Sequence, residues 1–109
     1  MKLNNYKKVS FLISGSGSNL LEILKKNHNN KDFKIITIIS NNNISTKIKS
    51  YLGKFYKNVL LRECQRTLQK KNFYDTDVIF SVGYMKVIEK SIIEHFDVIN
   101  LHPSILPNY

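Results

Sequence analysis

Short apolar runs alternate with amphipathic stretches along the whole chain. Five runs rich in β-branched residues predict strands: VSFLIS (9–14), IITIIS (35–40), NVLL (58–61), DVIFSV (77–82) and DVINLH (97–102). Four stretches between them have apolar residues at helical spacing and predict helices: 19–30, 44–53, 62–73 and 88–96. The run 35–40 is apolar almost throughout, so it is predicted to be a parallel strand covered on both faces.

Polar residues and a glycine mark the expected ends of these helices. Asn19, with Glu22 three residues later, resembles a capping box that starts the first helix, and the asparagines within 27–30 suit its end. Gly53 is expected to end the second helix. The last helix is expected to bury one apolar stripe, formed by Ile88, Ile92, Ile93 and Phe96.

This regular alternation predicts the fold class. Strands that alternate with helices form a parallel sheet with right-handed crossovers, so an α/β fold with an open, doubly wound, mainly parallel sheet is expected. A chain of 109 residues suffices for one such domain, 1–109, and for no second one. In sheets of this kind ligands bind beyond the carboxyl ends of the strands.

Composition excludes several classes of protein. No apolar run approaches the ~18 residues that cross a membrane, and the first residues do not resemble a cleavable signal, so a cytoplasmic location is expected. The single cysteine, Cys64, excludes an internal disulfide and a multi-cysteine metal site. Its thiol is predicted to lie on the face of the helix 62–73, and no metal is expected.

The net charge of +9 raises the question of nucleic-acid binding. Of the 17 basic residues 15 are lysines, and they are scattered along the chain, whereas nucleic-acid recognition favours arginine and clustered charge. The chain also has 13 Asn and 14 Ile, which indicates a general compositional bias. The charge is therefore interpreted as solvated surface that helps to attract anionic small molecules, and nucleic acid is not an expected partner.

The first loop, SGSGSN (14–19), is a candidate phosphate site. Its small residues let backbone N–H groups approach an anion, and the following helix adds the positive end of its dipole. It is not a dinucleotide motif, because Leu20 stands where the third glycine would be and no acidic residue follows the second strand. A sugar phosphate is favoured over NAD, and a tight turn with Asn19 as a helix cap is the alternative.

The stretch VGYMKVIE (82–89) follows the fourth strand. Gly83 allows a sharp turn, and the apolar side chains of Tyr84, Met85 and Val87 could line a slot for a flat ring. Ordinary core packing is the alternative interpretation of the same residues.

Asn100 and His102 are two residues apart on the last predicted strand, so their side chains leave on the same face. An amide and an imidazole that point together can hold and polarise one carbonyl oxygen, since the amide donates a hydrogen bond and the histidine moves a proton. Pro103 and Pro107 stiffen the segment that follows.

Three motifs carry a family resemblance: ISGSGSNL near the start, SVGYMKVIEKSIIEHF in the middle and INLHPSILPNY at the end. In this order they resemble the phosphoribosylglycinamide formyltransferase family, folate-dependent enzymes of purine synthesis with a Rossmann-like fold. The resemblance covers the whole chain but only the N-terminal half of a family member, so the domain is expected to be C-terminally incomplete and its sheet to stop after the fifth strand.

The resemblance implies a role for each motif. Gly17, Ser18 and Asn19 would hold the phosphate of glycinamide ribonucleotide. The formyl donor 10-formyltetrahydrofolate would lie against Met85, Lys86, Val87 and Ile88. Asn100 and His102 would be the catalytic pair for direct attack of the glycinamide amine on the formyl carbon, without a metal.

The resemblance also leaves alternatives. The family's catalytic aspartate lies downstream of the matched motifs, so the 109-residue chain is expected to be weakly active or inactive alone. Other formyltransferases and formyltetrahydrofolate deformylase share Asn-x-His, and a non-catalytic remnant that binds only a ligand or a partner is a further alternative. A complementing chain or a homo-oligomer would be a further partner. The stretch 41–76 aligns poorly with the family, so Arg62 receives no role.

Overall fold

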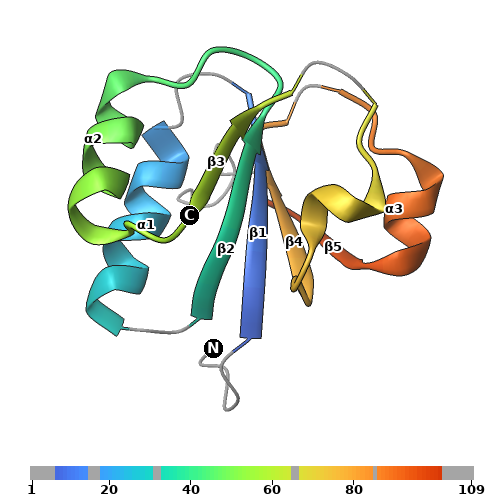
Figure 1. Cartoon of the computed structure of the whole chain (residues 1–109), viewed down its shortest axis with the longest axis horizontal. Helices are drawn as coiled ribbons and strands as arrows, with labels where there is room; N and C mark the ends of the chain where they lie inside the picture. The colour runs from blue at the N-terminus through green and yellow to red at the C-terminus, as the bar shows by residue number, and fades with distance from the viewer. Residues whose placement is uncertain (1–6, 15–17, 31–32, 65–66, 85, 102–109) are drawn as a thin grey trace, which may run out of the picture.

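Five strands form a single parallel sheet in the order β3-β2-β1-β4-β5 (Figure 1). The structure is a computed structural model that describes residues 7–14, 18–30, 33–64, 67–84 and 86–101. Its strands are β1 (Lys7–Ile13), β2 (Phe33–Ser40), β3 (Leu60–Glu63), β4 (Val78–Val82) and β5 (Asp97–Leu101). Its helices are α1 (Ser18–Asn30), α2 (Thr46–Phe55), the 3₁₀-helix η1 (Lys70–Phe73) and α3 (Lys90–His95).

The connections build helical layers on both faces of the sheet. The chain moves outward from β1 to β3, returns to the middle, and continues through β4 to β5, which is doubly wound topology. Figure 1 shows α1 and α2 on one face and η1 and α3 on the other, with the carboxyl ends of the strands at the top. The predicted fold class is therefore confirmed.

Two hydrophobic clusters hold these layers together. The cluster under α1 and α2 contains Phe11 and Ile38, and the cluster under η1 and α3 contains Leu12 and Ile39. Neighbouring residues of one strand thus face opposite layers, as strand geometry requires. β2 is buried from residue 35 to residue 40, which confirms the prediction of a strand covered on both faces.

The prediction of a helix over 62–73 was wrong. β3 occupies Leu60–Glu63, and the described part of the following segment forms only η1. Sheet pairing accounts for the difference, because the N–H of Cys64 donates to the carbonyl of Ser40 on β2 at 2.8 Å. The Cys64 thiol therefore does not lie on a helix face, and its partly buried side chain packs against the cluster under α3.

Two of the expected helix boundaries were also wrong. Gly53 lies inside α2, which begins after Ser45, whose Oγ accepts the N–H of Ile48 at 3.3 Å, and ends at Phe55. α1 begins at Ser18, so Asn19 is a residue of its first turn and not its cap. The expected end of α1 within 27–30 is confirmed, since the helix stops at Asn30.

The last helix is shorter than expected, and fewer of its predicted apolar side chains are buried. α3 spans Lys90–His95, where 88–96 was predicted. Ile92 is fully buried and Ile88 and Phe96 pack against the same cluster, but Ile93 is 54% exposed. Ile93 was therefore wrongly assigned to the buried stripe.

Candidate functional site

The last residues of β1, β4 and β5 lie side by side in the sheet. Val82 of β4 pairs with Ile13 of β1 on one side and with Leu101 of β5 on the other. Since neighbouring strands are about 4.8 Å apart, the ends of β1 and β5 are separated by about 10 Å. The segments that follow β1, β4 and β5 therefore leave the sheet at one edge, as the sequence predicted.

Asn100 is placed at this edge by β5. It pairs with Ser81 of β4 and is exposed, whereas Ser81 is 4% exposed. Val98, two residues earlier, packs against the cluster under α3, so the Asn100 side chain leaves on the same face of the sheet. His102 lies outside the described residues, and its position beside Asn100 stays a prediction.

The first turn of α1 lies at the same edge. Ser18 is its first residue and Asn19 is exposed in that turn, while Gly17 lies outside the described residues. The first turn contains no acidic residue, so nothing in it opposes the positive end of the helix dipole. The described part of the predicted phosphate loop is therefore suited to an anion.

The segment after β4 turns at Gly83, as the sequence predicted. Gly83 has φ of +68°, a conformation that favours glycine, and Tyr84 follows it. The pKa of the Tyr84 hydroxyl is raised, first because partial burial disfavours the phenolate and then because the charges of Glu89 and Cys64 lie nearby. Tyr84 is therefore protonated at neutral pH and can donate a hydrogen bond.

The four predicted folate-binding residues differ in their surroundings. Val87 is 89% exposed and Lys86 is exposed, whereas Ile88 is partly buried against the cluster under α3. Met85 lies outside the described residues. Of the predicted folate-binding residues, Lys86 and Val87 thus lie at the surface, whereas Ile88 packs against the hydrophobic core.

Arg62 lies on β3, at the opposite side of the sheet from β5. Three strand spacings separate β3 from β4, or about 14 Å. Arg62 is exposed and pairs with Ile39 of β2. This placement gives it no contact with the strand that carries Asn100.

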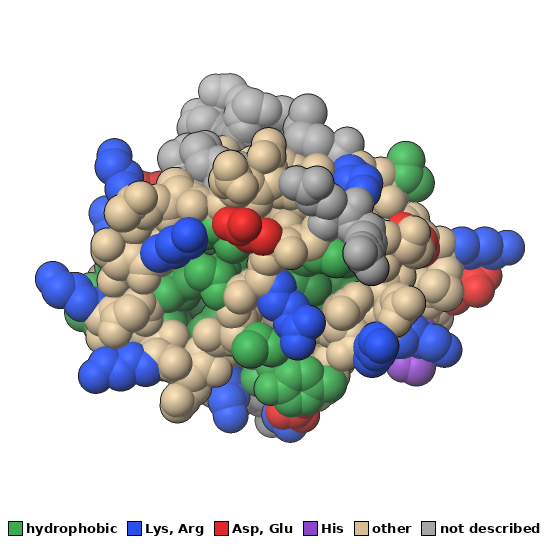
Figure 2. Space-filling model, turned by 45° about the horizontal axis from the view of Figure 1, so that its top comes forward, with side chains coloured by type: hydrophobic (Ala, Val, Ile, Leu, Met, Phe, Trp, Pro, Cys, Tyr) green, Lys and Arg blue, Asp and Glu red, His purple; other side chains and the backbone are tan. Residues whose placement is uncertain are grey.

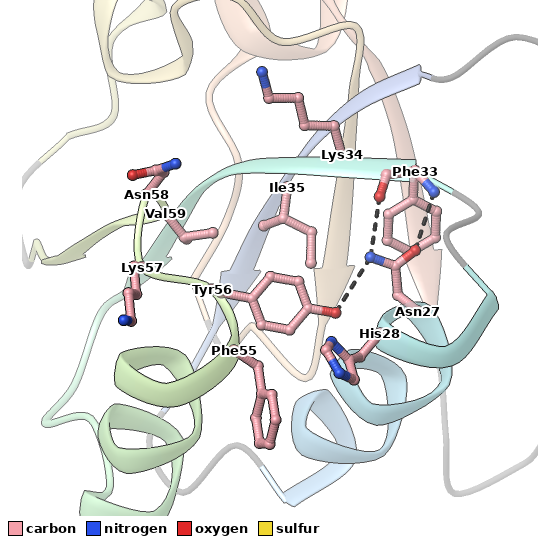
Figure 3. A pocket seen from close by; sticks show the side chains of 10 residues that line it. All are labelled: Asn27, His28, Phe33, Lys34, Ile35, Phe55, Tyr56, Lys57, Asn58 and Val59. Atoms are coloured by element: carbon pink, nitrogen blue, oxygen red, sulfur yellow. Dashed lines mark hydrogen bonds between the residues drawn. The ribbon is translucent and has the colours of Figure 1, made fainter.

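A pocket of about 210 Å³ lies at the other end of the sheet, where α1 ends and β2 begins (Figure 3). The side-chain amide of Asn27 in this pocket is already hydrogen-bonded to the backbone. Its Nδ2 donates to the carbonyl of Phe33 and its Oδ1 accepts the N–H of Phe33, both at 3.0 Å. The pocket is therefore part of the α1–β2 connection and is remote from Asn100.

Three further observations concern charge, metal binding and membrane crossing. Figure 2 shows lysine and arginine side chains distributed over the visible face, without a single basic patch. Among the described residues no group of three His, Cys, Asp or Glu side chains could hold a metal ion. In the same residues no helix has the length and hydropathy needed to cross a membrane.

Comparison with known proteins decides the family. The family model described as formyl transferase matches residues 7–109. The chain belongs to the formyl transferase family. A phosphoribosylglycinamide formyltransferase of Haemophilus influenzae is 30% identical to it over 94% of this chain and 54% of the relative.

Solved structures place this formyl transferase chain within a longer fold. The phosphoribosylglycinamide formyltransferase of Coxiella burnetii superimposes with a TM-score of 0.71 and 27% identity, over 96% of this chain and 55% of that one. The enzyme of Anaplasma phagocytophilum gives a TM-score of 0.66 and 25% identity, over 96% and 53%. The chain therefore spans about half the length of the relatives it matches.

Two residues at this edge of the sheet received no individual role from the sequence: Ser14, which begins the predicted loop 14–19, and Asn41. The Ser14 hydroxyl donates to Oδ1 of Asn41, which joins the ends of β1 and β2 beside the candidate phosphate loop. Asn41 also donates its backbone N–H to the carbonyl of Ile13 at 3.2 Å. Its position directly after a buried strand was the only signal, and the run of three asparagines, 41–43, indicates only a loop.

Proposed function

We propose that this chain contributes to formyl transfer from 10-formyltetrahydrofolate to the amine of glycinamide ribonucleotide. The observation that carries the proposal is the pairing of Val82 with Ile13 on one side and Leu101 on the other, because it brings Asn100 of β5 and the start of the loop after β1 to one edge. Membership of the formyl transferase family and similarity to glycinamide enzymes support the reaction class.

In the proposed arrangement the two substrates approach this edge from different strands. The phosphate of glycinamide ribonucleotide binds at residues 17–19, where the first turn of α1 offers N–H groups and its dipole. The pterin of the folate lies along residues 85–88, after the turn at Gly83. The strand spacing of about 10 Å between β1 and β5 leaves room for the glycinamide between the phosphate and the formyl group.

The proposed chemistry uses two side chains. The amine nitrogen forms a bond to the formyl carbon while the carbonyl π bond opens, which places negative charge on the oxygen. The Asn100 amide donates a hydrogen bond to that oxygen, and His102 takes a proton from the attacking nitrogen. The carbonyl then re-forms, the bond between the formyl carbon and the folate nitrogen breaks, and His102 gives its proton to that nitrogen. No covalent enzyme intermediate is required.

We further propose that residues 1–109 act as one domain that supplies part of the family's site. The chain covers 54% of the Haemophilus relative, so the remainder of the relative's length has no counterpart in these residues. The rest of the folate cleft would then be formed by residues other than these 109. Activity of the chain alone is accordingly expected to be weak.

The test is an assay of formyl transfer and formate release, combined with calorimetry of each substrate. Transfer to glycinamide ribonucleotide above the rate of formate release supports the proposed reaction. Formate release without transfer would indicate a deformylase instead. Heat of binding from either substrate without turnover would leave a ligand-binding protein, and the absence of both heats and of turnover would contradict the proposal.

A further inference from the structure

A groove of about 580 Å³ lies between α1 and α2. It is on the α1/α2 face of the sheet, whereas Asn100 projects from the face covered by η1 and α3. The groove is lined by Leu21, Lys25, Thr46, Lys47, Ser50, Tyr51, Lys54 and Phe55. None of these residues belongs to the proposed formyl-transfer site, so the groove needs an explanation of its own.

The floor of the groove is apolar and aromatic. The ring of Tyr51 lies 4.7 Å from the ring of Phe55, and Phe55 is 44% exposed. The imidazole of His28 also lies against Phe55, at 4.6 Å between ring centroids. Phe55 therefore contacts two rings while part of its side chain stays open to solvent, so an apolar group of a partner can pack on it.

The rim of the groove is basic. Lys25, Lys47 and Lys54 are exposed, and within the described residues none of the three forms an ion pair. The stretch 41–60 contains four lysines and no acidic residue. The one carboxylate of α1, that of Glu22, is not among the residues that line the groove.

We propose that this groove binds an amphipathic helix of an acidic partner protein. α2 is about 15 Å long, and Lys47 and Lys54 are two turns apart on it, at about 10 Å. Apolar anchors spaced i, i+4 and i+7 on a partner helix cover the same distance, so they can pack on Tyr51 and Phe55. Carboxylates beside those anchors then meet the lysines of the rim.

The charge of the chain decides between this occupant and others. A second copy would bring an equally basic surface, at a net charge of +9, against the three lysines. The segment 102–109 has no Asp or Glu side chain to match them. An acidic amphipathic helix offers carboxylates for the three lysines and apolar side chains for Tyr51 and Phe55, which line the same groove.

The test uses fluorescence anisotropy with a labelled, helix-forming peptide of three to four turns, with leucines spaced i, i+4 and i+7 and flanked by glutamates. A scrambled peptide of the same composition, vesicles of phosphatidylcholine and phosphatidylserine, and poly(U) are the comparison probes. The amphipathic peptide is expected to bind and the scrambled peptide is not. Equal binding of both peptides, or no binding of either, overturns the proposal.

Charge reversal identifies the surface that is used. Lys25→Glu, Lys47→Glu and Lys54→Glu together are expected to weaken peptide binding by about tenfold or more. The control carries Lys26→Glu, Lys49→Glu and Lys70→Glu, which are exposed outside the groove and change the net charge equally. Equal weakening in both triple variants would mean non-specific attraction and would contradict the proposal.

An uncharged substitution covers the case in which the triple variant does not fold. Phe55→Ser removes the exposed part of the floor and is expected to weaken peptide binding several-fold, with circular dichroism unchanged. Preferential binding of vesicles or poly(U) through the three lysines, without peptide binding, would assign the groove to a lipid or nucleic-acid surface and overturn the proposal. Formyl transfer is not expected to change in any of these variants, so this proposal and the proposed function can fail separately.

Discussion

Asn100 of β5 lies directly beside Ser81 of β4, and the two residues differ in exposure although they share a register position. Ser81 is 4% exposed, whereas Asn100 is exposed. The buried strand β4 fixes the position of β5, the outermost strand, so Asn100 is held at the surface by pairing with a strand of the hydrophobic core.

Asn100→Ala is expected to lower kcat/KM for formyl transfer by about 10²- to 10³-fold, because it removes a donor to the developing oxyanion. The free energy of unfolding is expected to change by less than about 0.5 kcal/mol, since the side chain is exposed. Asn29→Ala, an exposed asparagine of α1, is the control and should change neither quantity. Full activity in Asn100→Ala would remove the proposed role.

The glycines at 53 and 83 are expected to respond in opposite directions to alanine. Gly53 is an interior residue of α2 with open space where an added methyl group would lie, so Gly53→Ala is expected to stabilise the protein by about 0.5–1 kcal/mol. Gly83 also has open space, but its φ of +68° makes Gly83→Ala destabilising by about 1 kcal/mol or more. Urea unfolding of both variants checks the pair, and equal signs would contradict the backbone argument.

Thr37→Val is expected to stabilise the protein by about 1 kcal/mol. Thr37 is fully buried on β2, and within the described residues its hydroxyl has no hydrogen-bond partner, so a methyl group removes an unsatisfied polar atom. Ser10→Ala is the matched control, because the buried Ser10 hydroxyl is bonded to that of Thr76 at 2.8 Å and its loss should destabilise. Thermal unfolding of the two variants should shift the midpoint in opposite directions.

Tyr84→Phe is expected to reduce the loss of stability at alkaline pH. The pKa of Tyr84 is raised in the folded protein, so the unfolded chain loses the proton first and stability falls as pH rises above about 10. Below that pH the hydroxyl is protonated in both states and contributes no pH dependence. The free energy of unfolding is measured by urea titration between about pH 8 and pH 11. Its decrease with pH should be smaller for Tyr84→Phe than for Tyr74→Phe, which is the exposed control.

Much of the fold could be predicted from the sequence because buried parallel strands have a strong local signature. The run 35–40 gave the buried part of β2 and its end at Ser40, but not its first two residues, Phe33 and Lys34. A strand covered on both faces has little choice of composition, so its buried part is easily recognised. The stretch 62–73 could not be assigned in the same way. Its apolar spacing fits a helix, but pairing of Cys64 with Ser40, a residue 24 positions earlier, is a tertiary effect that local pattern does not contain.

The sequence could place the candidate site at the carboxyl edge of the sheet, but it could not give the direction of each side chain there. Alternation along the chain brings the residues after β1, β4 and β5 together in any doubly wound sheet, so Asn100 and Asn19 could be placed at one edge. Which face a side chain near this edge uses depends on packing. Ile88 packs inward, as its place on the predicted apolar stripe indicated, whereas Val87 is 89% exposed.

The strand order separates β3 from the strand that carries Asn100. Residues 41–76 form α2, β3 and η1, and β3 is the outermost strand on the side away from β5. Leu68 and Phe73 of that stretch are buried against Leu12 and Ile79, so the changes that can accumulate at the periphery without shifting the three strands whose ends are level are those in β3 itself. A deletion of one residue within β5 would have the opposite result, since it would rotate the carboxamide of Asn100 to the α1/α2 side of the sheet.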